Sequence, residues 1–251
     1  MPRKPIVGGN WKCNPGKLGD AMALVEAWKG KPFAADKIDV VICPTALHIS
    51  SVKPGLEAQG IMVSAQNVSK TDMGAFTGEW TGGQLVDMGI PWTLIGHSER
   101  RSKYGETDED TAIKVEKCQA AGVKVIFCIG ELLEERESGK TDEVNKRQLA
   151  AMIPKVKTWD DIVIAYEPVW AIGTGKVATP EQAQETHANI RAYLKEAVSA
   201  EVAEAVRIQY GGSVTPENCG ELIGKPDIDG FLVGGASLKP TFADIIVTTS
   251  A

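Results

Sequence analysis

The sequence lacks the features of a membrane protein or a nucleic-acid-binding protein. No apolar run approaches the roughly 18–20 residues that a membrane-spanning helix needs. No run of lysine or arginine exceeds two residues, and 33 acidic side chains against 27 basic ones give a net charge of −6. An acidic chain without a basic cluster binds nucleic acid poorly. We therefore expect neither a membrane nor a nucleic acid as a partner.

Paired cysteines and metal-binding motifs are missing as well. The five cysteines are an odd number without a Cys-x-x-Cys pair, which is typical of a reduced, cytoplasmic protein without disulfide bonds. The sequence has no His-Glu-x-x-His motif and no cluster of cysteine and histidine, so we expect no metal site. The first residues lead directly into a short apolar run and show no signal-peptide core.

What the sequence does have is a series of eight short apolar runs rich in β-branched residues. They cover residues 6–8, 38–43, 61–65, 92–96, 124–129, 162–166, 206–210 and 230–233. They begin about 32 residues apart on average, the length of a strand–helix–strand unit. They do not alternate strictly, which is typical of parallel strands that are buried on both faces.

Eight such units in 251 residues predict an α/β fold, a closed (β/α)8 barrel with residues 1–251 as a single domain. The alternative is an open doubly wound sheet, which carries a glycine-rich turn after its first strand. Here the first run is followed by Asn10-Trp11-Lys12 instead, and this favours the barrel.

Helix-start signals lie between the apolar runs. Thr179, followed by Pro180 and then by Gln182, has the pattern of a capping box and predicts a helix that starts at Pro180. Three further helices are expected to start directly after Thr81, Thr107 and Thr215. The two glycines after Thr81 weaken that signal because glycine has a low helix propensity. Gly122 is expected to end the helix that follows Thr107.

Polar residues and glycines follow five of the eight runs. In a parallel barrel the carboxyl ends of all strands open on one face, where the chemistry of such barrels takes place. The residues expected there are Asn10, Lys12, His97, Ser98, Glu99, Glu167, Gly211, Gly212, Ser213, Gly234 and Gly235.

Glu167 is either a carboxylate in a surface loop or a catalytic base. Pro168 stiffens the chain beyond it, and Gly173-Thr174-Gly175 with the apolar Ile172 follows in the same loop. A rigid start and a flexible tip are typical of a lid. A carboxylate at the start of a lid suggests a base that works away from water.

His97 starts a polar turn, whereas the other two histidines have simpler explanations. His187 lies on the apolar face of the helix after Thr179 and is expected to be a packed core residue, and His48 is expected in a loop or helix. If the turn at His97 opens a helix, the helix dipole lowers the pKa of the imidazole. A neutral imidazole could then donate a hydrogen bond to a carbonyl group.

Lys12 and the two glycine pairs are candidates for binding an anion. A lysine is by default a solvated surface residue, but Lys12 lies two residues past a strand end and could hold a phosphate or an enolate oxygen. Glycine lets backbone N–H groups approach phosphate oxygens closely. Two glycine pairs in adjacent loops, after residues 210 and 233, therefore favour a phosphate site over two tight turns.

Seven segments together closely resemble the triosephosphate isomerase family, whose fold is the (β/α)8 TIM barrel. They are residues 10–12 (NWK), 74–79 (GAFTGE), 96–101 (GHSERR), 128–131 (CIGE), 165–176 (AYEPVWAIGTGK), 210–214 (YGGSV) and 230–239 (GFLVGGASLK). The resemblance extends from the first strand to the last. It implies an isomerase of glycolysis and gluconeogenesis that interconverts dihydroxyacetone phosphate and D-glyceraldehyde 3-phosphate and needs no cofactor and no metal.

The resemblance also implies the catalytic roles. Glu167 would move a proton between two carbons, and His97 would pass protons between the oxygens of an enediolate. Lys12 would stabilise the enediolate and the phosphate, and Asn10 would position Lys12. Glu99 and Cys128 would support these groups.

Phosphate binding, lid motion and assembly are implied in the same way. The phosphate would be bound by N–H groups of Gly173, Ser213, Gly234 and Gly235. The hinges of the lid would be residues 168–170, which include Pro168 and Trp170, and residues 176–178, which include Lys176. Tyr210 would hold the closed lid, and Glu131 would contact Trp170 in the open lid.

The family works as a homodimer, which points to two further positions. Thr77 would enter a neighbouring subunit beside that subunit's residues 10–13, and Cys13 would lie in this interface. Arg191 and Asp227 would form a structural ion pair. The alternatives are a barrel enzyme for another small sugar phosphate and a non-catalytic binding or structural protein. A non-catalytic protein would have no reason to keep Glu167, His97 and Lys12 together.

Overall fold

The computed structural model describes residues 3–171 and 178–250, and its centre is a closed barrel of eight parallel strands. The strands are β1 (Ile6–Asn10), β2 (Asp39–Cys43), β3 (Met62–Ala65), β4 (Trp92–Ile95), β5 (Lys124–Ile129), β6 (Ile162–Tyr166), β7 (Arg207–Tyr210) and β8 (Gly230–Val233). Each strand pairs with the next one in the sequence, and β8 pairs with β1, where Ile6 lies opposite Gly230. This last pairing closes the barrel and excludes the open sheet. The predicted fold is confirmed.

All eight predicted runs contain a strand, with ends that differ by at most two residues. The largest difference is at β1, which continues through Gly9 to Asn10. A side chain at Gly9 would have a Cβ only 2.6 Å from the end of the Ile42 side chain, so glycine lets β1 pack closely against the apolar layer outside the barrel. The extension places Asn10 in the last position of the strand.

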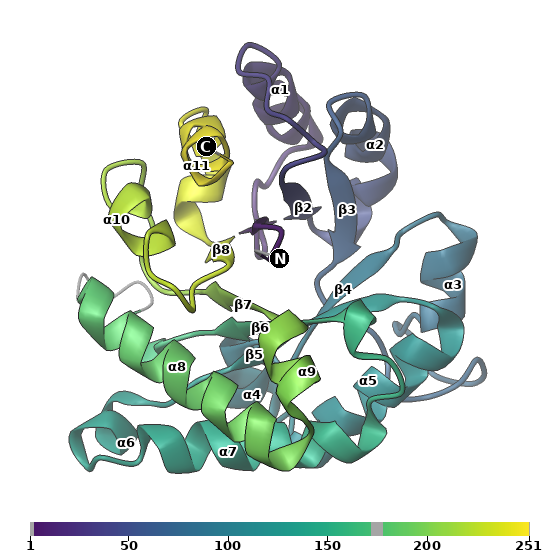
Figure 1. Ribbon diagram of the computed structural model, residues 1–251. Helices are drawn as coiled ribbons and strands as arrows, with labels where there is room; N and C mark the ends of the chain where they lie inside the picture. Colours follow the sequence, from purple (N-terminus) through teal and green to yellow (C-terminus); the bar gives the residue numbers. More distant parts are fainter. Residues whose placement is uncertain (1–2, 172–177, 251) are drawn as a thin grey trace.

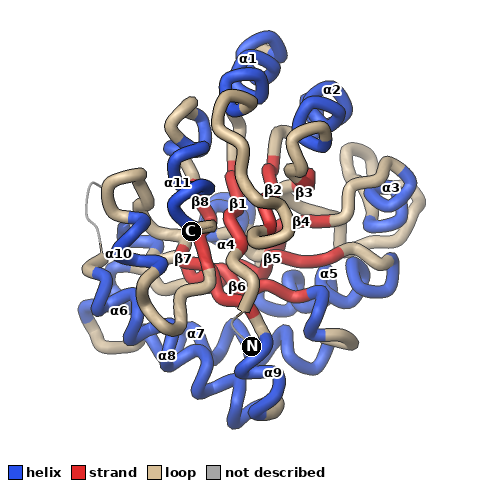
Figure 2. Tube along the Cα trace, turned by 45° about the horizontal axis from the view of Figure 1, so that its top comes forward, coloured by secondary structure: helices blue, strands red, loops and turns tan. Residues whose placement is uncertain are grey.

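Helices surround the barrel (Figure 1). They are α1 (Leu18–Trp28), α2 (Ala46–Glu57), α3 (Gly82–Asp87), α4 (Ser98–Tyr104), α5 (Asp108–Ala121), α6 (Leu133–Glu137), α7 (Thr141–Met152), α8 (Pro180–Ala197), α9 (Ala200–Ala205), α10 (Cys219–Ile223) and α11 (Phe242–Thr249). Short 3₁₀ helices are η1 (Ile153–Lys155), η2 (Trp159–Asp161), η3 (Val169–Ala171) and η4 (Gly235–Leu238). Figure 2 shows the strands at the centre and the helices outside them. None of the helices in the described ranges is long and apolar enough to cross a membrane.

The predicted helix starts are confirmed at three of four positions. The capping boxes after Thr81, Thr107 and Thr179 all form, and Gly122 ends α5 with a φ of 83°. The start predicted after Thr215 is wrong, because α10 begins only at Cys219. Residues 216–218 form a turn instead, in which the Thr215 carbonyl accepts from the N–H groups of Asn218 and Cys219 at 3.3 and 3.1 Å. The Asn218 side chain accepts a hydrogen bond from the Thr215 N–H at 2.8 Å.

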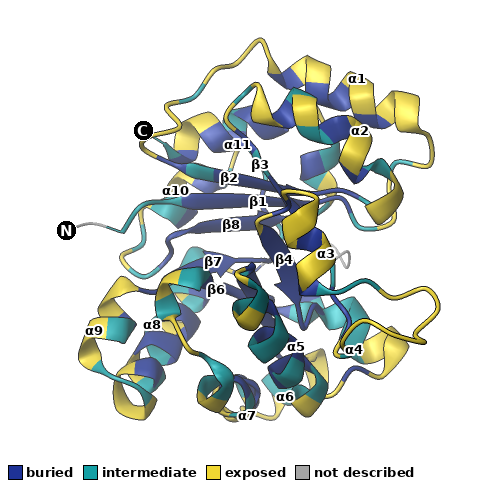
Figure 3. Cartoon of the chain, turned by 90° about the vertical axis from the view of Figure 1, so that its right-hand side faces the viewer, coloured by how far each residue is buried: buried dark blue, intermediate teal, exposed yellow. Residues whose placement is uncertain are grey.

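Two apolar layers hold the barrel together. The inner layer fills the barrel and includes Val41, Trp92, Ile126 and Leu232, while a larger outer layer lies between strands and helices. Figure 3 shows that the strands are almost entirely buried, whereas helices such as α1, α2 and α8 have a buried and an exposed side. Strands buried on both faces explain why the apolar runs do not alternate. They also leave the strand ends as the place for polar side chains.

Candidate active site

The structure brings the predicted residues together at the carboxyl end of the barrel. A cavity of about 450 Å³ is lined there by residues that follow β1, β4, β6, β7 and β8. They include Asn10, Lys12, His97, Glu167, Gly211, Gly212, Ser213, Gly234 and Gly235. Five separate strands therefore contribute to one cavity, as the barrel topology requires.

Glu167 is a buried carboxylate held by two donors. Only 3% of the residue is exposed, and its Oε1 lies 3.0 Å from Nε2 of His97. Its Oε2 accepts a hydrogen bond from the Ser98 backbone N–H at 3.1 Å. Gly130 makes this placement possible, because a Cβ there would lie 1.7 Å from the Glu167 carbonyl oxygen.

The hydrogen bonds of His97 describe a neutral imidazole. His97 is the N-cap of α4, and its Nδ1 accepts a hydrogen bond from the Glu99 N–H at 3.2 Å. An Nδ1 that accepts carries no proton, so Nε2 carries it and donates to Glu167. The predicted helix start at this turn is confirmed.

The expected direction of the pKa shift of His97 is wrong for this arrangement. Burial lowers the pKa of His97, but the neighbouring Glu167 carboxylate raises it by more, so the pKa lies above its ordinary value. Burial raises the pKa of Glu167, and His97 together with the Ser98 N–H lowers it to below its ordinary value. The attraction between the two side chains outweighs burial, and Glu167 is ionised at neutral pH.

Lys12 is held in a strained backbone conformation. Its φ of 54° is the only positive value at a non-glycine residue in the described part of the chain. Its N–H donates to Asn10 Oδ1 at 2.9 Å, and its carbonyl accepts from Gln66 Nε2 at 2.7 Å. Its ammonium lies 3.1 Å from Glu99 Oε1. Gln66 was not predicted as a site residue, and its only signal in the sequence is its place directly after the third apolar run.

The glycine loops after β7 and β8 face the same cavity. η4 starts at Gly235, directly after β8, so backbone N–H groups open toward the cavity at a helix start. Among the residues that the structure describes, none accepts a hydrogen bond from the N–H of Ser213, Gly234 or Gly235. Gly173, the fourth predicted donor, lies outside the described residues.

The start of the predicted lid is held against Glu131. Trp170 Nε1 donates to Glu131 Oε1 at 2.9 Å, and the Tyr166 hydroxyl donates to the same oxygen at 3.0 Å. The Arg136 guanidinium lies over the Trp170 ring at 5.4 Å. This contact is the one implied for an open lid. Ile172 and Lys176 lie outside the described residues.

The remaining site residues fall into three groups. Cys128 is fully buried in β5, where burial first and the Glu167 charge second raise the pKa of its thiol. Cys13 and Thr77 are exposed. The Tyr210 side chain is buried, and burial raises the pKa of its hydroxyl to about 12, partly offset by a hydrogen bond with the Ala178 backbone.

Three further sequence predictions are confirmed away from the cavity. Arg191 Nε lies 2.8 Å from Asp227 Oδ1, and the same guanidinium binds Asp229 at 2.9 Å. His187 is fully buried against Tyr166, and burial lowers its pKa to about 4. His48 lies within α2.

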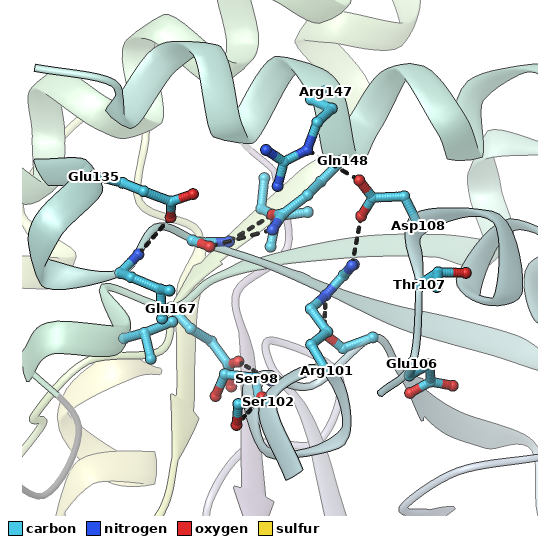
Figure 4. A pocket seen from close by; sticks show the side chains of 15 residues that line it. Ser98, Arg101, Ser102, Glu106, Thr107, Asp108, Glu135, Arg147, Gln148 and Glu167 are labelled. Atoms are coloured by element: carbon cyan, nitrogen blue, oxygen red, sulfur yellow. Dashed lines mark hydrogen bonds and ion pairs between the residues drawn. The ribbon is translucent and has the colours of Figure 1, made fainter. Parts of the chain in front are cut away.

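A second cavity of about 400 Å³ lies on the other side of Glu167 (Figure 4). Arg101 and Arg147 both point toward Asp108 there, with contacts of 2.6 and 3.1 Å. Arg101 also donates to the Gly96 carbonyl at 2.7 Å and to the Cys128 carbonyl at 3.3 Å. These two hydrogen bonds connect the carboxyl ends of β4 and β5 next to the site. The sequence showed Arg101 in a motif but not this role.

A family model and three relatives with similar sequences all point to one family. A family model described as Triosephosphate isomerase matches residues 5–249. The chain is 53% identical over 247 residues to a protein of Oryza sativa subsp. japonica named "Triosephosphate isomerase, cytosolic", covering 98% of this chain and 97% of that one. It is 51% identical over 248 residues to "Triosephosphate isomerase" of Coprinopsis cinerea and 50% identical over 246 residues to that of Neurospora crassa. Both of these matches cover 98% of each chain.

Proposed function

The chain belongs to the triosephosphate isomerase family and is an isomerase of triose phosphates, and we propose that Glu167 is the base of its reaction. Glu167 takes a proton from the hydroxymethyl carbon of dihydroxyacetone phosphate, and the electron pair of that C–H bond moves to form an enediolate. Glu167 then returns the proton to the neighbouring carbon, which gives D-glyceraldehyde 3-phosphate. The supporting observation is an ionised carboxylate, 3% exposed, that lies 3.0 Å from an imidazole N–H in the cavity.

His97 and Lys12 stabilise the charge that develops on the substrate oxygens. The Nε2–H of a neutral His97 donates to the carbonyl oxygen and passes protons between the two oxygens of the enediolate. The ammonium of Lys12 attracts both the enediolate and the phosphate, and Asn10 holds the backbone of Lys12 through its N–H. Glu99 lies 3.1 Å from the Lys12 ammonium and 3.8 Å from His97 Nδ1, and Cys128 lies near enough to Glu167 to be affected by its charge.

The phosphate is bound by backbone N–H groups and covered by the lid. Ser213, Gly234 and Gly235 supply N–H groups within the described residues, and Gly173 supplies one from the lid. Closure removes the Trp170 contact with Glu131, and the closed lid binds Tyr210. Pro168, Ile172 and Lys176 act as hinge and cover. A closed lid keeps water away from the enediolate and prevents loss of its phosphate.

The partner in this proposal is a second copy of the chain. A cavity of about 210 Å³ opens beside Lys12 and Cys13, and Gln66 and Tyr104 also line it. The loop that carries Thr77 exposes Met73 by 79% and Phe76 by 48%, so it offers apolar surface to a neighbour. Insertion of this loop into the partner's cavity would support Lys12 from below. The name of the rice relative supports the cytosol as the site of action.

The test measures turnover of D-glyceraldehyde 3-phosphate by the purified protein and by the Glu167→Gln and Glu167→Asp variants. We expect Glu167→Gln to lose at least about 10²–10⁴-fold in kcat, because its amide cannot accept the proton. Glu167→Asp retracts the carboxylate by roughly 1 Å and should lose on the order of 10²-fold. Full kcat in folded Glu167→Asp would show that another residue is the base.

A further inference from the structure

The loop after β7 is fixed at both ends of the segment that faces the substrate cavity. Upstream, the Gly211 N–H donates to the Tyr166 carbonyl at 2.7 Å. Downstream, Asn218 holds two backbone groups with one side chain: its Nδ2 donates to the Ser213 carbonyl at 3.0 Å, and its Oδ1 accepts from the Thr215 N–H at 2.8 Å. Between these anchors lie Gly212, Ser213 and Val214, which all line the cavity.

The two Asn218 bonds determine which way this backbone faces. In a trans peptide the C=O and the N–H point in opposite directions. Asn218 itself does not line the cavity, so the Ser213 carbonyl that it binds points away from the cavity. The Val214 N–H of the same peptide is therefore directed toward it. Glycines at 211 and 212 leave the preceding backbone with wide conformational freedom, so side-chain anchoring is needed to fix Ser213.

We propose that Asn218 is a positioning residue that holds the backbone after β7 in the form that binds the substrate phosphate. The inference rests on the proposed function, in which the Ser213 N–H is one of the phosphate donors. Asn218 does not touch the substrate and acts only through Ser213 and Val214. The bond to the Thr215 N–H is of the kind that a side chain in the first helical turn makes at a helix start, and the bond to the Ser213 carbonyl is additional to it.

The test separates phosphate binding from the chemistry. We expect Asn218→Ala to raise the dissociation constant of inorganic phosphate, a competitive probe, and the KM for D-glyceraldehyde 3-phosphate by the same factor, roughly ten- to hundredfold. This is the loss expected when one charge-assisted hydrogen bond is misplaced. Turnover of D-glyceraldehyde, which lacks the phosphate, should be unchanged. Asn218→Asp keeps the acceptor for Thr215 but loses the donor to Ser213, and it should weaken phosphate binding as well.

Gln119→Ala is the matched control. The Gln119 amide accepts from the Lys157 N–H at 2.6 Å and donates to the Thr158 carbonyl at 2.6 Å, so it fixes a loop in the same way before β6, at the opposite end of the barrel. This variant should bind phosphate like the parent. The inference is overturned if both Asn218 variants bind phosphate like the parent, or if D-glyceraldehyde turnover falls by the same factor as phosphate affinity. A parent protein that does not bind phosphate would instead overturn the proposed phosphate site.

Discussion

In the mechanism that we propose, the charges of the pair formed by Glu167 and His97 change during the reaction. As long as Glu167 is a carboxylate, its charge raises the pKa of His97. When Glu167 accepts the substrate proton it becomes neutral, and that attraction disappears. Burial, which lowers the pKa of His97, is then the dominant influence. The imidazole therefore stays neutral at the stage where it has to donate a proton to an enediolate oxygen.

The buried His187 should make the stability of the protein depend on pH. Its Nδ1 lies 3.1 Å from the Asp227 carbonyl, its Nε2 is buried without a partner among the described residues, and its pKa is about 4. The unfolded chain has a histidine pKa of about 6.5, so between these values the unfolded state binds more protons and stability falls as pH falls. From pH 7 to pH 5, we expect His187 to reduce the free energy of unfolding by about 2 kcal/mol.

Urea unfolding of the parent and of His187→Gln at pH 7 and pH 5 measures this contribution. Both proteins must be compared at one protein concentration, because dissociation of an oligomer also changes apparent stability. The variant should lose less stability than the parent over this range. Equal losses in both proteins would mean that His187 does not titrate in this way.

At the scale of single elements, helix α3 contains a matched pair of glycines. A Cβ at Gly82 would lie 3.0 Å from the Ala121 Cβ of α5, so Gly82 allows these two helices to approach closely. A Cβ at Gly83 meets no atom closer than 3.9 Å. Gly83 therefore lowers the stability of α3, and it provides no close packing in return.

We expect Gly83→Ala to stabilise the protein by about 0.5–1 kcal/mol, because alanine loses less backbone entropy in a helix. Gly82→Ala should not stabilise it, because the added methyl group is crowded by Ala121. Thermal unfolding of the two variants gives the comparison directly. Equal stabilisation by both would show that α3 can move away from α5 at no cost.

Helix starts and strands could be predicted from the sequence where residues close together in the chain determine them. A capping box needs only Thr179 and Gln182, and a strand buried on both faces needs only a short apolar run. The helix expected after Thr215 begins only after a turn at residues 216–218. Asn218 accepts from the Thr215 N–H there just as Gln182 accepts from the Thr179 N–H, so this bond alone does not determine where a helix begins.

The site contacts that could not be predicted from the sequence join residues that are far apart in the chain. Gln66 acts on a carbonyl 54 residues away, and Arg101 acts on one 27 residues away. Nothing in the neighbourhood of either residue indicates that contact. The direction of the pKa shift of His97 was missed for the same reason, because Glu167 lies on a different strand.

At the scale of the whole molecule, the net charge of −6 opposes an anionic substrate. The cavity compensates locally, since Lys12 and Lys239 line it together with the glycine loops. In the proposed site, a few cations and N–H groups would thus bind the phosphate despite the negative net charge of the chain.

The proposed homodimer makes the strongest prediction for the whole molecule. Phe76, 48% exposed, lies next to Thr77 in the loop that would enter the partner's cavity beside Lys12. Phe76→Glu places a charge into that contact, where it would be desolvated without a partner, so we expect monomers at micromolar concentration. The cavity beside Lys12 would then lose its support, and kcat/KM should fall by at least about 10²-fold, the cost of a misplacement of roughly 1 Å.

Sedimentation measures the oligomeric state of Phe76→Glu, and activity assays measure its kcat/KM. The control is a variant of an apolar residue on another face of the molecule. Val247, 41% exposed on α11, is an apolar surface residue of similar exposure, and Val247→Glu should remain dimeric and active. A dimeric Phe76→Glu protein would place the interface elsewhere. A monomeric Phe76→Glu protein with parental kcat/KM would show that the partner does not support Lys12, and each subunit would then be complete by itself.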